Sequence, residues 1–177
     1  MEHTLLFTAE RIAQKVTDLA SAIDAASVES YVVITVLKGA AIFSSDLVRA
    51  MTTDTELTYI TASSYIDGFT PGDSLTINPE SELALDGRHV LIVEDIIDTG
   101  RTLQRIKAIV ANQHAKTITT VALINKTDRR TTAFEPTHTG FQITDQFIYG
   151  YGLDWNQQFR DLPYIAIANP HDTITRR

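Results

Sequence analysis

Residues 90–103 read Val-Leu-Ile-Val-Glu-Asp-Ile-Ile-Asp-Thr-Gly-Arg-Thr-Leu, and this stretch decides how the fold is interpreted. Its first four residues are apolar and largely β-branched, which is typical of a strand buried on both faces of a parallel sheet. Two carboxylates, Glu94 and Asp95, follow that strand directly, and a polar turn then leads into a helical pattern. Because open α/β sheets bind ligands at the carboxyl ends of their strands, the stretch predicts a binding site here.

The polar turn, residues 98–102, is the part of this stretch that predicts an anion site. A helix that begins there presents free backbone N–H groups and the positive end of its dipole to an anion. Gly100 lets the backbone approach that anion closely, and Thr99 and Thr102 add hydroxyl donors. A phosphate cradle beside two carboxylates suits a sugar phosphate, in which the carboxylates would bind either hydroxyl groups or a metal ion.

Strands and helices alternate along the rest of the chain. Apolar periodicity predicts helices that begin after Thr8, at Ala40 and at Arg101, the last ending at residue 111. The predicted strands cover residues 31–37, 57–66, 90–93, 117–124, 141–149 and 164–168, with a loop or loose hairpin at 67–80. This order predicts an α/β fold with a central, mostly parallel sheet flanked by helices, in one domain over residues 1–177.

Composition excludes several classes of function. The net charge is −7 with no long basic run, which argues against binding to nucleic acid or to a membrane surface. The chain has no cysteine, so disulfides, zinc–thiolate sites and cysteine nucleophiles are excluded. No apolar stretch approaches the roughly 18 residues of a membrane span, and the N-terminal residues lack a signal-peptide pattern. We therefore expect a cytoplasmic protein.

Residues 90–102 resemble the phosphoribosyl diphosphate motif of the type I phosphoribosyltransferases: an apolar strand, two acids, two apolar or small residues, then Asp-Thr-Gly/Ala-x-Thr. The resemblance implies that the fold carries a small hood, built from both ends of the chain, and a mobile lid at about residues 64–79. It also implies roles for individual residues. The 5′-phosphate would contact Asp98, Thr99, Gly100, Arg101 and Thr102; the ribose and Mg²⁺ would contact Glu94 and Asp95; pyrophosphate would contact Lys38 and Gly39; and Ser64 and Tyr65 would belong to the lid.

Two further segments resemble the hypoxanthine-guanine phosphoribosyltransferases, which act on 6-oxopurines. Lys126, at the end of an apolar strand, matches a lysine that donates to the purine 6-oxygen, and an ammonium group can only donate. Residues 145–164 match the purine-binding segment of that family. The match implies that Phe147 stacks on the base, the Ile148 backbone reads its edge, Asp154 lies near the base and Mg²⁺, and Arg160 binds pyrophosphate.

Each of these residues also has a plain structural interpretation. An acidic pair after a strand is often a solvated strand end, and a lysine there often only extends its ammonium group into water. Lys38 could be a surface lysine at a helix start, and Arg160 a surface arginine. Aromatic residues in a strand are more often part of a core than of a ligand site. The order and completeness of the matches over residues 37–164 favour the functional interpretation.

The expected function is purine salvage: transfer of the 5-phosphoribosyl group from phosphoribosyl diphosphate to hypoxanthine or guanine. Asp98 is the expected general acid or base at purine N7, Mg²⁺ the expected cofactor, and a homodimer or homotetramer the expected assembly. Two alternatives remain open at this stage. One is an enzyme that uses xanthine or a pyrimidine, and the other is a nucleic-acid-binding regulator that keeps the fold. A concentrated basic surface would favour the regulator, and the sequence has none beyond Arg129-Arg130.

Overall fold

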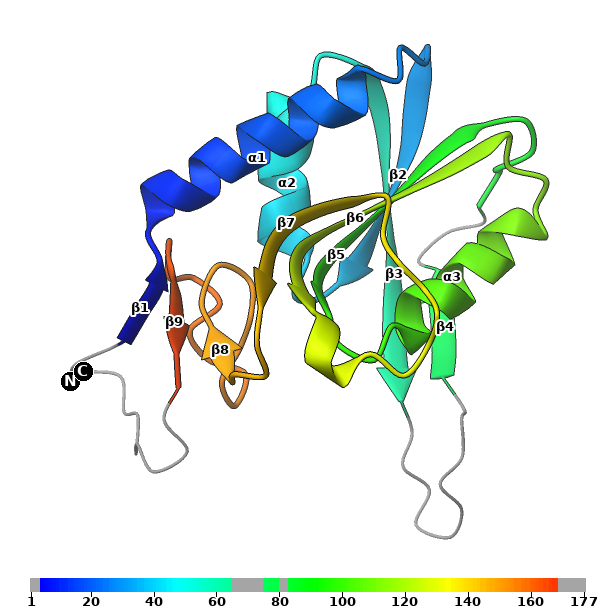
Figure 1. Ribbon diagram of the computed structural model, residues 1–177. Coiled ribbons are helices and arrows are strands. Elements are labelled where there is room, and N and C mark those ends of the chain that lie inside the picture. Colours follow the sequence, from blue (N-terminus) through cyan, green and yellow to red (C-terminus); the bar gives the residue numbers. More distant parts are fainter. Residues whose placement is uncertain (1–3, 65–74, 80–82, 169–177) are drawn as a thin grey trace, which may run out of the picture.

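The computed structural model describes residues 4–64, 75–79 and 83–168, and within these it contains two sheets (Figure 1). The larger sheet has the strand order β4-β3-β2-β5-β6-β7; only β4 runs antiparallel to its neighbour, so five strands are parallel. Its strands are β2 (Ser30–Leu37), β3 (Asp54–Ser64), β4 (Leu75–Pro79), β5 (His89–Ile97), β6 (Thr117–Lys126) and β7 (His138–Ile143).

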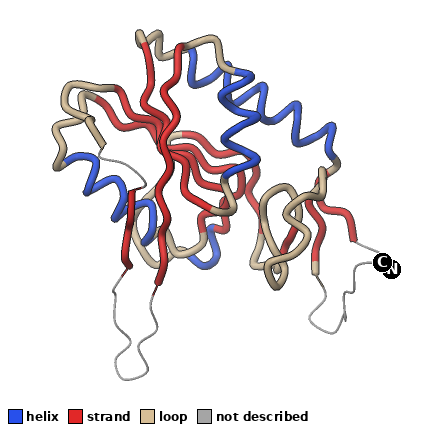
Figure 2. Tube along the Cα trace, turned by 180° about the vertical axis from the view of Figure 1, so that it is seen from behind, coloured by secondary structure: helices blue, strands red, loops and turns tan. Residues whose placement is uncertain are grey.

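Helices cover both faces of this sheet, as Figures 1 and 2 show. Helices α1 (Ala9–Asp24) and α2 (Ala41–Ala50) pack on one face, and α3 (Arg101–Ala111) packs on the other. Each interface is a buried apolar cluster, and together the two clusters bury the β5 residues Val90, Leu91, Ile92 and Val93 on both faces. A short 3₁₀ turn, η1 (Thr127–Arg129), follows β6.

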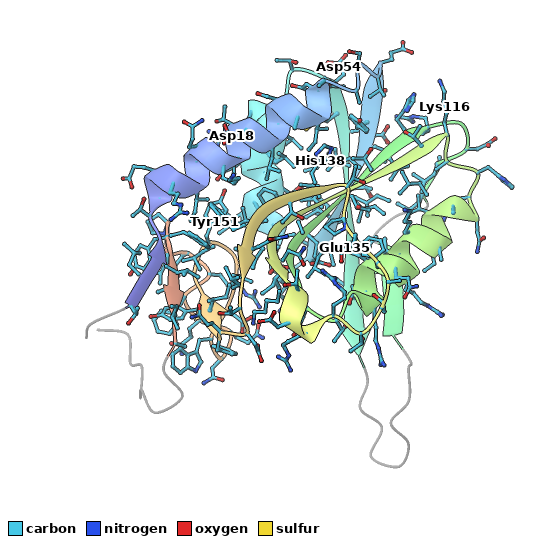
Figure 3. The ribbon with its side chains drawn as sticks, viewed as in Figure 1. Asp18, Asp54, Lys116, Glu135, His138 and Tyr151 are labelled. Atoms are coloured by element: carbon cyan, nitrogen blue, oxygen red, sulfur yellow. The ribbon has the colours of Figure 1, made fainter. Side chains whose placement is uncertain are left out.

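A second, three-stranded antiparallel sheet joins the two ends of the described chain, and we call it the hood sheet. It has the order β1-β9-β8, from Thr4–Phe7, Ile165–Ile167 and Ile148–Tyr149. The ring of Phe7 stacks on Phe141 of β7, with 4.0 Å between ring centroids. Tyr151, below α1 in Figure 3, donates a 2.7 Å hydrogen bond from its hydroxyl to Asp46 of α2. The hood sheet and the loop that follows β8 are thus fixed to β7 and to α2.

The predicted α/β fold, with a mostly parallel sheet flanked by helices, is confirmed, while several predicted boundaries are wrong. Strand β5 continues to Ile97, so Glu94 and Asp95 lie inside it rather than after it. The predicted strand at 141–149 is two strands, β7 and β8, in different sheets. Strand β4 occupies part of the predicted loop, and β1 was not predicted. Ser64 ends β3, but Tyr65 and most of the predicted lid lie outside the described residues.

Asp24, at the C-terminal end of α1, accepts hydrogen bonds from the backbone N–H and hydroxyl groups of both Thr52 and Thr53, at 2.7–3.2 Å. Burial alone would raise the pKa of Asp24, but these hydrogen bonds outweigh it and hold the pKa below its ordinary value. We expect Asp24→Asn to lower the free energy of unfolding by about 1 kcal/mol at pH 7, because the carboxylate is partly exposed.

The lowered pKa of Asp24 sets the pH dependence of this contribution. It should be complete above the ordinary aspartate pKa and should disappear as the pH falls through the lowered value. Denaturant unfolding of both proteins at pH 7 and near pH 3 checks this, since the difference between them should shrink at the lower pH. A difference that stayed constant with pH would show that the carboxylate charge plays no part.

Candidate active site

Three adjacent strands deliver the predicted binding groups to one edge of the sheet. Strands β2, β5 and β6 are parallel neighbours, so their carboxyl ends lie together. Lys38 and Gly39 follow β2, the acidic pair and the polar turn come at the end of β5, and Lys126 is the last residue of β6. Groups far apart in the sequence are therefore brought side by side in the order predicted for pyrophosphate, ribose phosphate and base.

The polar turn opens α3 in the geometry expected of an anion site. Gly100 is the N-cap residue and has a φ of +84°, a left-handed conformation that glycine adopts without steric cost. The helix begins at Arg101, so the N–H groups of its first turn have no partner within the helix. A cavity of about 80 Å³ opens at this turn. Its lining residues are Glu94, Ile96, Ile97, Asp98, Thr99, Gly100, Thr102 and Leu103.

The segment after β6 supports this turn from behind. The Thr99 carbonyl oxygen accepts hydrogen bonds from the Thr131 backbone N–H at 3.1 Å and from the Thr132 hydroxyl at 3.2 Å. A Cβ atom on Gly100 would clash with that Thr132 hydroxyl. Gly100 is therefore required twice, by its backbone conformation and by the close packing of this neighbouring segment.

Glu94 and Asp95 are both buried, with less than a tenth of each residue exposed. Burial raises the pKa of Glu94 well above its ordinary value, and the neighbouring charge of Asp95 raises it further. Burial also raises the pKa of Asp95, although its hydrogen bonds and the charge of Arg160 oppose the rise. Two desolvated acids side by side favour binding of a cation or of hydroxyl donors, either of which would compensate the buried charge.

The predicted pyrophosphate loop packs directly against this acidic pair. The peptide bond between Leu37 and Lys38 is cis, and Lys38 is exposed. A Cβ atom on Gly39 would overlap the Asp95 carboxylate, and a Cβ atom on Gly152 would overlap the Gly39 carbonyl oxygen. The backbone at Gly39 is thus pressed against the Asp95 side chain on one side and against the backbone at Gly152 on the other, so neither glycine has room for a side chain.

Arg160 and Asp154, which sequence reasoning assigned to pyrophosphate and to Mg²⁺, are paired with each other. The Arg160 Nη2 atom lies 2.6 Å from Asp154 Oδ1, and its Nη1 donates to the Gly152 carbonyl oxygen at 2.7 Å. The other Asp154 oxygen accepts a hydrogen bond from the Gln157 backbone N–H at 2.8 Å. Asp154 therefore orients the guanidinium beside the loop of Gly39, and any direct metal contact would compete with this ion pair.

Lys126 is buried, with 6% of the residue exposed, so it is not a lysine that merely extends into water. Its Nζ lies 3.8 Å from Asp145 Oδ1, and Arg129 Nη1 lies 3.7 Å from the same oxygen. Arg129 Nη1 also lies 3.3 Å from Asp98 Oδ2. A chain of alternating charges thus links the predicted acid or base, Asp98, to the predicted base-recognition lysine.

Arg129 and Asp145 are residues of this site that sequence reasoning missed. Arg129 was considered only as part of a basic dipeptide, and Asp145 only as the start of a matching segment. Their separation in sequence follows no helix or strand period, because they lie on two loops that meet at the carboxyl edge. No local signal identified them.

Phe147 is one of the few large apolar side chains that the described residues leave exposed, with 55% of it accessible. Its ring contacts Trp155 edge-on, with 5.8 Å between centroids. The next residue, Ile148, is buried and begins β8. An exposed ring directly before a strand is suited to stacking on a planar base, and stacking of this kind would remove the ring from water.

The acidic pair fits Mg²⁺, whereas a site built from protein ligands alone does not. Within the described part of the chain, no group of three or more His, Asp or Glu side chains is placed to hold a metal. Mg²⁺ is commonly held by one or two carboxylates together with substrate phosphates and water. Glu94 and Asp95 are the residues that would supply those carboxylates.

Comparison with known proteins agrees with this geometry. Residues 4–156 match the phosphoribosyl transferase domain family, and the chain belongs to that family. Among its relatives, the hypoxanthine-guanine phosphoribosyltransferase of Mycobacterium avium is 34% identical over 94% of this chain and 86% of its own length. A bifunctional TilS/HprT protein of Listeria innocua is 38% identical over 78% of this chain, but the chain spans only 21% of that longer protein.

A crystal structure of a hypoxanthine-guanine phosphoribosyltransferase from Bacillus anthracis superimposes with a TM-score of 0.89 at 35% identity. The alignment covers 95% of this chain and all of the other. The predicted family, the fold and the class of enzyme, a phosphoribosyltransferase of purine salvage, are therefore confirmed. No helix among the described residues is long and apolar enough to span a membrane.

Proposed function

We propose that the protein transfers the 5-phosphoribosyl group from phosphoribosyl diphosphate to hypoxanthine or guanine, giving the nucleoside monophosphate and pyrophosphate. One observation carries this proposal. The carboxyl ends of β2, β5 and β6 hold a close-packed glycine loop, a buried acidic pair with a phosphate turn, and a buried lysine, in that order. The names of the relatives support the same reaction.

In this reaction the bond between the ribose anomeric carbon and a diphosphate oxygen breaks as a base nitrogen bonds to that carbon. The turn at residues 98–102 would hold the 5′-phosphate, while Glu94 and Asp95 would bind the ribose side. Negative charge develops on the departing pyrophosphate, and Lys38, the N–H groups of its loop and Arg160 would stabilise that charge. These three binding positions would place the anomeric carbon between the base and the leaving group.

The purine would lie between Phe147 and the end of β6. Lys126 would donate to the 6-oxygen, and it would face the amino group of adenine donor against donor, which rejects that base. The Ile148 backbone would read the purine edge. Asp98 would accept the proton released at N7, and its Oδ1 atom is buried without a hydrogen-bond partner among the described residues. In accepting that proton this oxygen would have no hydrogen bond to give up.

We also propose that Glu94 and Asp95 would hold Mg²⁺ together with the diphosphate, and that the ion would supply positive charge beside the leaving group. Loss of turnover after chelation, with recovery on adding Mg²⁺, tests this requirement. The enzyme is further proposed to act in the cytoplasm as a homodimer or homotetramer. A solution mass of two or four times the 19.6 kDa chain supports that assembly, and a mass of one chain contradicts it.

Turnover of five bases tests the proposed substrate class. Hypoxanthine, guanine, xanthine, adenine and uracil would each be supplied with phosphoribosyl diphosphate and Mg²⁺, and product formation followed by absorbance. We expect hypoxanthine and guanine to be turned over and adenine to be at least ~10³-fold poorer, because Lys126 cannot accept a hydrogen bond. Turnover of xanthine or uracil alone would show that this base, and not hypoxanthine or guanine, is the substrate. No turnover by folded protein would favour a regulator.

A further inference from the structure

Arg130, on the loop after β6, has a position that the proposed reaction does not use. Its side chain is 9% exposed, yet its only hydrogen bond among the described residues goes from Nη2 to the amide oxygen of Asn125. Its Nε and Nη1 atoms are buried and have no hydrogen-bond partner within that part of the chain. Asn125 itself is 1% exposed and carries no charge.

The charge of Arg130 is therefore poorly compensated. A guanidinium stays protonated in proteins, and a buried charge is costly unless an opposite charge faces it. The nearest carboxylate, Glu135 in Figure 3, lies 3.8 Å from Nε, beyond hydrogen-bond distance, and is mostly exposed to water. Solvent weakens such a contact, so a positive charge remains inside the protein at this point.

This charge lies next to Gly100 in the polar turn, residues 98–102, which we call the phosphate turn. A Cβ atom built on Gly100 would be 2.9 Å from Arg130 Nη1 and 3.1 Å from its Cδ, so the guanidinium touches the backbone that forms the cradle. The same loop holds the Thr99 carbonyl oxygen through Thr131 and Thr132. Arg130 thus packs between Asn125, near the end of β6, and Gly100, the N-cap residue of α3.

We propose that Arg130 is a positioning residue that holds the phosphate turn and supplies a buried positive charge for the 5′-phosphate of phosphoribosyl diphosphate and of the nucleotide product. The proposal rests on the proposed function and deepens it. A bound phosphate dianion would supply the negative charge that no described side chain places within hydrogen-bond distance of Arg130. Binding of the phosphate would therefore compensate the positive charge of the guanidinium. The N–H groups of α3 contact the phosphate, and Arg130 strengthens their potential from behind without contacting it.

Paired ligands with and without the phosphate isolate this role. Dissociation constants of inosine 5′-monophosphate, inosine and pyrophosphate would be measured for the wild type, Arg130→Gln and Arg130→Lys. We expect Arg130→Gln to raise the dissociation constant of the monophosphate by about tenfold or more, while the dissociation constants of inosine and pyrophosphate change little. Arg130→Lys, which keeps the charge but loses the planar fork, should lie between the two. Arg105→Gln is the matched control, because it removes an exposed charge from α3.

An unchanged monophosphate affinity in Arg130→Gln, or an equal loss for inosine, would overturn the proposal. A wild type that bound neither the monophosphate nor phosphoribosyl diphosphate would instead overturn the proposed function. Should Arg130→Gln fail to fold, Asn125→Asp provides the test. This variant keeps the arginine and places a carboxylate next to its Nη2 atom. That variant should raise the dissociation constant of the monophosphate severalfold and leave that of inosine unchanged. An unchanged affinity for the monophosphate would contradict the proposal.

Discussion

Replacing Gly39 with alanine is expected to lower kcat/KM by about 100-fold, because the added methyl group would occupy the position of the Asp95 carboxylate. Either the predicted pyrophosphate loop or the acidic pair must then move, and a displacement of about 1 Å in a catalytic constellation costs a factor of that size. The Gly39 carbonyl oxygen is also packed against Gly152, so the loop has no free direction in which to retreat. Steady-state kinetics with hypoxanthine measures the loss.

Gly87→Ala is the matched control for this substitution. Gly87 has a φ of +68°, and a Cβ atom there would meet nothing within 4 Å, so alanine introduces backbone strain far from the site. We expect this control to lower the melting temperature while kcat/KM stays near the wild-type value. If Gly39→Ala remained folded by circular dichroism and kept its activity, the close contact between loop and acidic pair would be irrelevant to catalysis.

These glycines show what a sequence reveals and what it hides. The turn at Gly100 was predicted, because glycine between threonines at the head of an amphipathic helix is a local pattern. The predicted helix start at Arg101 and end at residue 111 are confirmed for the same reason. Gly39 and Gly152 are required by contacts across more than 50 residues of sequence, and no local period encodes such an approach.

Strand β5 shows a related limit. The unbroken apolar run ends at Val93, so Glu94 and Asp95 were predicted to follow the strand. The hydrogen-bonded ladder with β6 nevertheless continues, pairing Glu94 with Ala122 and Ile97 with Asn125. Two acids lie in the buried end of the sheet, which burial statistics alone would not predict. Raised pKa values at this position follow from the same burial.

Four charged residues of the site were assigned individually, but their partners were not. Resemblance gave Asp154 and Arg160 separate roles, and the structure pairs them at 2.6 Å. Likewise, Asp98 and Lys126 were assigned separately, and Arg129 and Asp145 link them through contacts of 3.3–3.8 Å. Side-chain partners between distant segments depend on the tertiary fold, so only the structure reveals them.

Asp98→Asn is expected to lower kcat by about 10²–10⁴-fold while changing the KM values for hypoxanthine and phosphoribosyl diphosphate far less. Asparagine has nearly the same shape as aspartate and can still fill the head of the phosphate turn. It cannot take up a proton, however, so the N7 proton would lose its acceptor at the moment the new bond forms. Steady-state kinetics with both substrates separates kcat from KM.

The same substitution also weakens the ion pair between Asp98 and Arg129, and Arg129→Gln separates the two effects. Arg129 is about half exposed, so the ion pair itself should contribute little, and we expect Arg129→Gln to lower kcat by less than about tenfold. If both variants lost activity equally, Asp98 would act by holding Arg129 in place. A large loss confined to Asp98→Asn would leave proton transfer as its role.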